Sequence, residues 1–145
     1  KRSQCGRPIA RFQAIQQQLA LLAGEAIAAS TAVESAMAIV DRAEQSGYFS
    51  GKPGDEEADR AGKALHLAAM MAKIRTGEAV GPATAIAHQV HGAIGFTDEH
   101  ILHYSTRRLW SWREEFGTES EWADLLGRAV LERGGDQLWP LVTSL

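Results

Sequence analysis

The 145-residue sequence predicts an all-α protein, a four-helix up-and-down bundle that forms one domain over residues 1–145. Three observations predict it. Val, Ile and aromatic residues never alternate with polar ones over a useful length, whereas Ala, Leu, Glu and Gln dominate. Apolar residues recur at steps of three and four along long segments, which is typical of packed helices. Glycine-containing breaks divide the chain into four such segments.

The first helix is expected from about Ile9 to Ser46, where Gly47 takes the place of a C-terminal cap. Small residues in its middle would allow close approach of a second helix. Nine apolar residues with helical spacing should share its packed face: Phe12, Ile15, Leu19, Leu22, Ala26, Ala29, Val33, Ala36 and Val40.

The second helix is expected from Asp55, a capping residue, to the glycine turn formed by Gly92 and Gly95. Acidic residues in its first turn suit the positive end of the helix dipole. Pro82 lacks an amide donor, so we expect it to kink or interrupt this helix.

Two shorter helices complete the predicted bundle. Thr97 and Asp98 are good N-cap residues for a third helix over 100–115. The break at 116–118 ends it, and Thr118 and Glu121 have the spacing of a capping box for the fourth helix. Residues 134–135, both glycine, end that helix.

Composition excludes several classes of protein. A net charge of −3 argues against bulk attraction to nucleic acid. Cys5 is the only cysteine, which fits a reducing compartment, so we expect a cytoplasmic protein. No apolar run approaches the roughly 20 residues of a membrane span, and none is expected. Because the chain begins with Lys1 rather than Met, we expect it to be a piece of a longer polypeptide.

Four histidines surround the glycine turn, which raises the question of a metal. The bundle di-iron pattern needs Glu-x-x-His pairs, and the sequence contains neither these nor His-Glu-x-x-His. We therefore expect no metal site. The four are His88, His91, His100 and His103.

The glycine turn allows a second hypothesis, because bare backbone beside a helix N-terminus can hold an anion such as phosphate. A Gly-x-x-Gly turn also occurs in some RNA-binding modules, but those need strands and a basic surface that this sequence lacks. Gln13 follows Phe12 near an earlier glycine turn, and its amide either reaches a ligand or is solvated.

Two further segments have both a functional and a structural interpretation. The stretch 107–113 interleaves Arg and Trp, which can stack on nucleotides or acyl chains but is also typical of protein interfaces. Glu114 and Glu115 end the third helix against the preference of the helix dipole. Such a carboxylate is a candidate general base, or an ordinary surface charge.

Several stretches, in order and with suitable spacing, resemble the acyl-CoA dehydrogenase family. Residues 2–13 resemble its Arg-x-Gln-Phe-Gly-Lys-Pro-Ile-x-x-Phe-Gln block, and residues 89–96, Gln-Val-His-Gly-Ala-Ile-Gly-Phe, resemble its Gln-x-His-Gly-Gly-x-Gly-Phe/Tyr signature. Ala72-Lys73, and Arg107-Arg108 followed by Gly117-Thr118, fall at the expected later places. The resemblance covers nearly the whole chain.

The resemblance implies the C-terminal helical domain of a flavoprotein that oxidises an acyl-CoA to the trans-2-enoyl-CoA, with FAD as acceptor and an electron-transfer acceptor beyond it. Family members are dimers or tetramers, so a homo- or hetero-oligomer is implied. By position, the FAD contacts carried over from the family are Arg2, Gln4, Phe12, Gln13, Gln89, Val90, Gly92, Thr118 and Ser120. The missing domains would supply much of the acyl-CoA pocket, so the isolated chain is expected to fold but not to catalyse.

The sequence departs from the family pattern at three positions. Cys5 replaces a usual Phe, and Ala93 replaces a glycine. The usual catalytic Glu immediately precedes Gly-Thr, and Phe116 stands there, with Glu115 one residue earlier. Either the loop shifts so that Glu115 serves as base, or the base lies outside this chain, or the subunit is non-catalytic and pairs with an active partner. A competing hypothesis is an oligomerisation bundle that does not bind the cofactor.

Overall fold

A computed structural model describes residues 3–4, 6–50 and 56–143. Its two long helices are α1 (Gln13–Gln45) and α2 (Glu56–His91), and its shorter ones are α3 (Leu102–Glu114), α4 (Glu119–Arg133) and α5 (Leu138–Thr143). The prediction of an all-α protein is confirmed. The one addition of another kind is a small antiparallel pair, β1 (Ser3–Gln4) with β2 (Arg7–Pro8), in which Ser3 faces Pro8.

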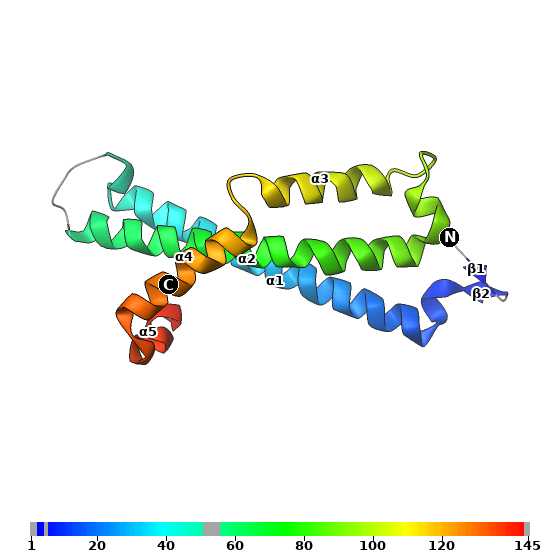
Figure 1. The fold of residues 1–145 in the computed structure, drawn as a ribbon, viewed down its shortest axis with the longest axis horizontal. Helices are drawn as coiled ribbons and strands as arrows, with labels where there is room; N and C mark the ends of the chain where they lie inside the picture. Colours follow the sequence, from blue (N-terminus) through cyan, green and yellow to red (C-terminus); the bar gives the residue numbers. More distant parts are fainter. Residues whose placement is uncertain (1–2, 5, 51–55, 144–145) are drawn as a thin grey trace.

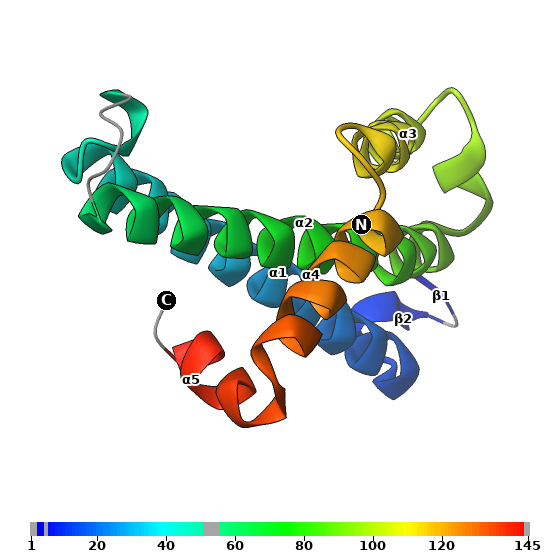
Figure 2. The ribbon, with the colours of Figure 1, turned by 60° about the vertical axis from the view of Figure 1, so that its left-hand side comes forward.

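Helix α2 is the centre of the fold. α1 runs antiparallel along one side of it, and α3 returns along the C-terminal half of α2 on the other side (Figure 1). α4 crosses the middle of α2, and α5 folds back beyond it (Figure 2). The N-terminal pair of strands lies at the end of the molecule where α2 finishes, so residues distant in sequence gather at that end.

The boundaries of α1 follow from local chemistry. After Pro8 the chain makes a 3₁₀ turn over Ile9–Arg11, and Phe12 is extended, with φ −86° and ψ 129°. The α-helix therefore begins at Gln13 rather than at Ile9. At the other end Gly47 has φ +79°, the left-handed conformation that a side chain would strain, and this confirms its predicted role.

Helix α2 corrects one prediction. It passes through Pro82 without interruption. The proline removes one backbone hydrogen bond, but Ala79 and Val80 on one side and Thr84 on the other are buried against neighbouring elements. Tertiary packing therefore holds the helix together. The predicted cap Asp55 lies outside the described residues.

The predicted start of α3 was also wrong. Thr97 does not cap it: the N-cap position is Ile101, and the Thr97 hydroxyl donates back to the carbonyl of Ile94 at 3.0 Å. The glycine segment forms a 3₁₀ helix, η3 (Gly92–Phe96), and α3 begins only at Leu102. The backbone N–H of Leu102 donates to Nδ1 of His100 at 3.1 Å, so a histidine ring takes the place of the expected Thr or Asp cap.

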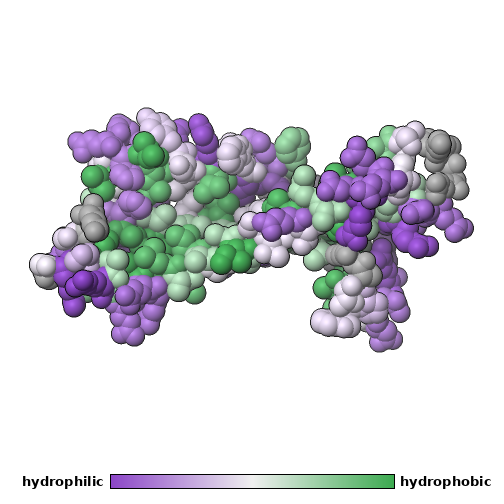
Figure 3. Space-filling view, turned by 180° about the vertical axis from the view of Figure 1, so that it is seen from behind, coloured by the Kyte–Doolittle hydropathy of each residue, from purple (hydrophilic) through white to green (hydrophobic). Residues whose placement is uncertain are grey.

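The core is thin for a domain of this mass. Buried Leu67, Met70 and Leu141 form its main cluster between α2, α4 and α5, with half-buried Trp122 against it. The solvent-accessible surface is 10098 Å², whereas a compact monomer of 15.7 kDa is expected to expose about 7,300 Å². Figure 3 shows hydrophobic residues gathered over the half of the molecule where α1 begins and α2 ends. The chain therefore exposes more surface than a compact monomer of its mass, and part of that surface is apolar.

Only part of the apolar stripe predicted on α1 packs against α2. Ala29 and Ala36 are half-buried, and Ile39 and Ala43 are buried next to them. Leu19, Ala26 and Val33, on the adjoining edge of the same stripe, are exposed. The stripe is wider than the one helix that covers it.

By length and composition, α1 is apolar enough to cross a membrane, since one of its 18-residue windows has a mean hydropathy of 1.3. A core helix of a soluble protein passes the same test, so this is weak support for a span. Within α1, Glu25 forms an ion pair with Arg75 of α2. The absence of a membrane span stays a prediction.

Candidate functional site

The turn between α3 and α4 contains Glu115, and the sequence left open whether this residue is the catalytic base. Glu115 ends α3 in an extended conformation, and its side chain is exposed. Phe116 then takes φ +60°, the only positive φ among the described residues other than glycine, and Gly117 has φ +96°. A left-handed conformation costs a residue other than glycine about 1–2 kcal/mol. The Phe116 side chain is 91% exposed, so little burial in this domain offsets that cost.

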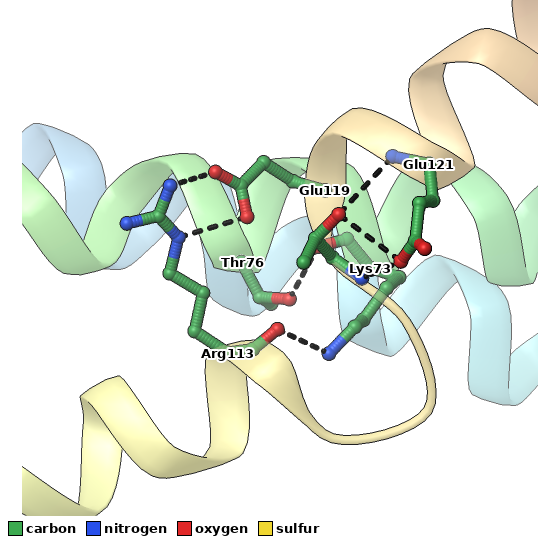
Figure 4. Close-up of polar contacts among 6 residues, drawn as sticks. Lys73, Thr76, Arg113, Glu119 and Glu121 are labelled. Carbon is green, nitrogen blue, oxygen red and sulfur yellow. Dashed lines mark hydrogen bonds and ion pairs between the residues drawn. The ribbon is translucent and has the colours of Figure 1, made fainter.

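Lys73 of α2 holds the first half of this turn. Its Nζ donates to the carbonyls of Trp112 at 3.1 Å, Arg113 at 3.0 Å and Glu115 at 2.7 Å. An ammonium at the C-terminus of a helix interacts favourably with the helix dipole and with the carbonyls that have no intrahelical partner. Figure 4 shows the lysine reaching from α2 toward the turn.

The second half of the turn is held by α4. Nε1 of Trp122 donates to the carbonyl of Phe116 at 2.9 Å. Gly117 leaves room for that indole, since a Cβ there would lie 3.0 Å from Nε1. The strained residue is therefore fixed by side-chain donors from two different helices.

Arg113 and Glu119 join the two helices across the turn. The guanidinium donates through two nitrogens to the two carboxylate oxygens, a bidentate arrangement (Figure 4). Glu119 lies against α2, where a Cβ on the buried Gly77 would come within 2.9 Å of the Glu119 Cβ. The close approach of α4 to α2 thus depends on a glycine.

The predicted capping box at the start of α4 is confirmed. The Glu121 backbone N–H donates to the Thr118 hydroxyl at 3.3 Å, and the Glu121 carboxylate accepts from the Thr118 backbone N–H at 2.7 Å. The backbone N–H of Thr118 and, second, its hydroxyl, which donates to the same carboxylate at 3.1 Å, lower the pKa of Glu121 below its ordinary 4.5. Its own carboxylate already neutralises this helix N-terminus, and this weighs against phosphate contact at Thr118 and at exposed Ser120. That contact stays a prediction.

A groove of about 670 Å³ lies at the far end of α3, between the last turns of α2, η3 and α3. Gln89 and Gly92, both predicted ligand contacts, line it together with Ala93, Phe96 and Trp110. Gly92 has φ +66°, so the sharp turn predicted there is present. Small residues and aromatic rings line the groove together, and such rings can stack on a flat heteroaromatic ligand.

The other predicted contacts are placed in two groups. Gln4, Phe12 and Gln13 lie at the N-terminal end, where the Arg7 guanidinium sits 4.2 Å from the Phe12 ring centre. The strands lie at the same end of the molecule as the last turn of α2 (Figure 1), which carries Gln89 and the half-buried Val90 and leads into Gly92. Glu115, Thr118 and Ser120 lie at the opposite end of α3, whose 13 residues span about 20 Å. Arg2 lies outside the described residues.

The histidines near η3 make local contacts. Nε2 of His88 lies 3.0 Å from the hydroxyl of Thr106, and the rings of His91 and His100 are 4.8 Å apart. Nδ1 of His103 lies 2.7 Å from the carbonyl of His100. Within residues 3–4, 6–50 and 56–143, no group of three or more His, Cys, Asp or Glu side chains is arranged to hold a metal ion.

With this geometry established, comparison with known proteins decides the family. The family model described as the acyl-CoA dehydrogenase C-terminal domain matches residues 1–131. The chain belongs to the acyl-CoA dehydrogenase family. Searches of curated proteins and of solved structures found no match.

The groove beside Gln89 is where two predicted ligand contacts and two aromatic rings come together in this acyl-CoA dehydrogenase domain. Its walls combine bare backbone at Gly92 with the ring of Trp110. Nδ1 of His88, in the same wall, is buried without a hydrogen-bond partner among the described residues. Such orphaned atoms are uncommon in complete structures.

Sequence reasoning missed the residues that hold the α3–α4 turn in this acyl-CoA dehydrogenase domain. The sequence marks Lys73 only as part of a family block, and Trp122 only as an apolar residue of the predicted fourth helix. Their role depends on contacts 39 to 42 positions apart for the lysine and on side-chain direction for the tryptophan. The one available signal was the proximity of Trp122 to the Phe-Gly-Thr break.

Proposed function

We propose that the full-length protein is an FAD-dependent acyl-CoA dehydrogenase that oxidises an acyl-CoA thioester to the trans-2-enoyl-CoA. This chain would contribute FAD-binding and subunit-interface surface. Membership of the acyl-CoA dehydrogenase family supports the class of enzyme. The observation that carries the cofactor assignment is the 670 Å³ groove, because it brings Gln89 and Gly92 together with two aromatic rings.

The residues at the groove end would hold the ADP portion of FAD. Exposed Gln89 offers an amide that can both donate and accept hydrogen bonds, and Gly92 exposes backbone for close approach. Gln4, Phe12 and Gln13 lie at the same end and would add contacts to the same cofactor. Because both groups are on the molecular surface, a neighbouring subunit's cofactor could reach them.

Bound FAD would supply the acceptor for the hydride that leaves the β-carbon of the acyl group. The proton at the α-carbon needs a base, and Glu115 is the candidate in this chain because its carboxylate is exposed on the turn. Its backbone carbonyl is fixed by Lys73, so the residue has a defined position. A base outside this chain is the alternative.

A second candidate function is that of a non-catalytic subunit paired with an active partner. The exposed Phe116 favours it, because the turn presents an aromatic ring immediately before Gly-Thr. The large accessible surface favours a homo- or hetero-oligomer in either case. We place the protein in the cytoplasm, with an electron-transfer protein as the partner that reoxidises the flavin.

The test is the visible spectrum of the full-length, flavin-loaded protein during titration with acyl-CoAs. Bleaching of the flavin by one acyl-CoA is the expected result, and Glu115→Gln should then slow that bleaching at least 100-fold if Glu115 is the base. Bleaching that survives Glu115→Gln places the base elsewhere. A protein that holds no flavin when purified alone or with its partner chain would overturn the proposal.

A further inference from the structure

The α3–α4 turn is fixed more firmly than a connection between two surface helices requires. Lys73 from α2 binds the carbonyl of Glu115, and Trp122 from α4 binds the carbonyl of the next residue, Phe116. The Thr118–Glu121 capping box follows directly. Each peptide group from 115 to 118 is thus tied to a neighbouring element or to the start of α4.

Lys73 directs its whole hydrogen-bonding capacity at this turn. An ammonium has three N–H donors, and three backbone carbonyls lie within 3.1 Å of Nζ. The residue is half-buried, so its charge is set against the end of α3 rather than in bulk solvent. The planar guanidinium of an arginine could not reproduce this three-way arrangement.

The turn that these hydrogen bonds fix holds the side chain of Phe116 on the molecular surface. Its backbone is strained at φ +60°, yet its ring packs against almost nothing in this domain. Backbone strain that the surrounding structure imposes on a residue with an exposed side chain is characteristic of functional sites. Trp112, one helical turn earlier, is also more than half exposed, so the apolar surface continues along α3.

We propose that Phe116 contacts the acyl chain of the substrate and sets chain-length preference, and that Lys73 and Trp122 are positioning residues that hold it there. This inference rests on the proposed function. An aromatic ring held by a rigid turn favours the binding of a long apolar acyl chain, because the contact buries methylene groups of that chain. A short acyl chain has few methylene groups to bury there and gains little binding free energy. The turn therefore contributes selectivity whether or not Glu115 serves as base.

The experiment uses the full-length, flavin-loaded protein, assembled with its partner chain if it has one. Flavin spectral changes are recorded with a series of straight-chain acyl-CoAs from two to sixteen carbons, giving a Kd for each, and kcat and KM where turnover occurs. Phe116→Ala should weaken binding of the long acyl-CoAs about 10-fold or more, with little change for acetyl-CoA. The flavin spectrum without acyl-CoA should not change.

The positioning role is tested by combining substitutions. Lys73→Met should lose the same chain-length preference, and adding it to Phe116→Ala should cause little further loss, because both act through one ring. Trp122→Phe, which keeps an aromatic ring but removes the N–H donor, tests the other anchor if Lys73→Met does not fold. Lys63→Met, on an exposed part of α2 away from the turn, is the control.

Two results would overturn the inference while leaving the proposed function intact. One is a Phe116→Ala protein that binds all chain lengths as the wild type does. The other is a fully additive loss in the double variant, which would make Lys73 a structural residue only. If no acyl-CoA perturbs the flavin of the wild-type protein, the proposed function fails and this inference fails with it.

Discussion

At the scale of single residues, hydrogen bonds around the α3–α4 turn decide both conformation and charge. The Lys73 ammonium and the Trp122 indole hold the carbonyls on either side of a strained residue, Phe116. Two positions further on, Thr118 and Glu121 satisfy each other and begin α4. An anionic carboxylate accepts these hydrogen bonds more strongly than a protonated one, so the stability of the arrangement must depend on pH.

The capping box predicts an acid-sensitive contribution to folding. The pKa of Glu121 is lowered in the folded protein, so its contribution is fully present above the ordinary value of 4.5 and is lost as pH falls through the lowered value. Glu121→Gln should therefore be less stable than wild type at pH 7, and the difference should shrink below about pH 4.5. Urea unfolding of the 145-residue chain from pH 7 to pH 3 measures it. A difference that stays constant over this range would contradict the expectation.

At the scale of elements, α2 is the scaffold on which the other helices are placed. Its contact with α1 is the longest, and it includes the ion pair between Glu25 and Arg75. Its contact with α4 is closest at Gly77, where the Arg113–Glu119 pair lies. The α3–α4 turn keeps its geometry because both of its helices are placed on α2.

Glycine substitutions can separate helix propensity from helix packing. In Gly77→Ala the new Cβ would lie 2.9 Å from the Glu119 Cβ, so α4 must move away, and we expect a loss of about 1–3 kcal/mol in the free energy of unfolding. Gly24→Ala in α1 is the matched control, because nothing lies within 4 Å of its new Cβ. It should gain about 0.5–1 kcal/mol from helix propensity alone. Equal changes in the two variants, measured by urea unfolding, would show that α4 does not approach Gly77 closely.

At the scale of the whole molecule, this domain exposes more surface than a compact monomer of its mass does. It exposes about 2,800 Å² more than expected of a compact monomer, whereas a standard protein interface buries about 1,200–2,000 Å² in total. Part of the excess is the uncovered edge of the α1 stripe, where Leu19 is 39% and Val33 41% exposed. The apolar residues of this uncovered edge also contribute to the high mean hydropathy of α1.

Charge placed on that edge should change the state of assembly. Val33→Lys would bury an unpaired ammonium if the stripe is covered by another subunit, so the full-length protein should shift to a smaller species in sedimentation experiments. Ile27→Lys is the control, because it lies about 120° around α1 from Val33 at 100° per residue and is already 66% exposed. The same shift in both variants, or in neither, would place the interface elsewhere.

The sequence by itself determined the helical class, the four main helices, the turn at Gly92 and the capping box at Thr118, because these depend on local periodicity and on residues a few positions apart. Only the tertiary structure decided the rest. Pro82 stays within a continuous helix because its neighbours are packed, and α3 begins only at Leu102, whose N–H donates to the ring of His100. The hydrogen bonds that hold the α3–α4 turn come from Lys73 on α2 and Trp122 on α4. The lysine contact spans a long stretch of chain, and no local sequence pattern encodes such a contact.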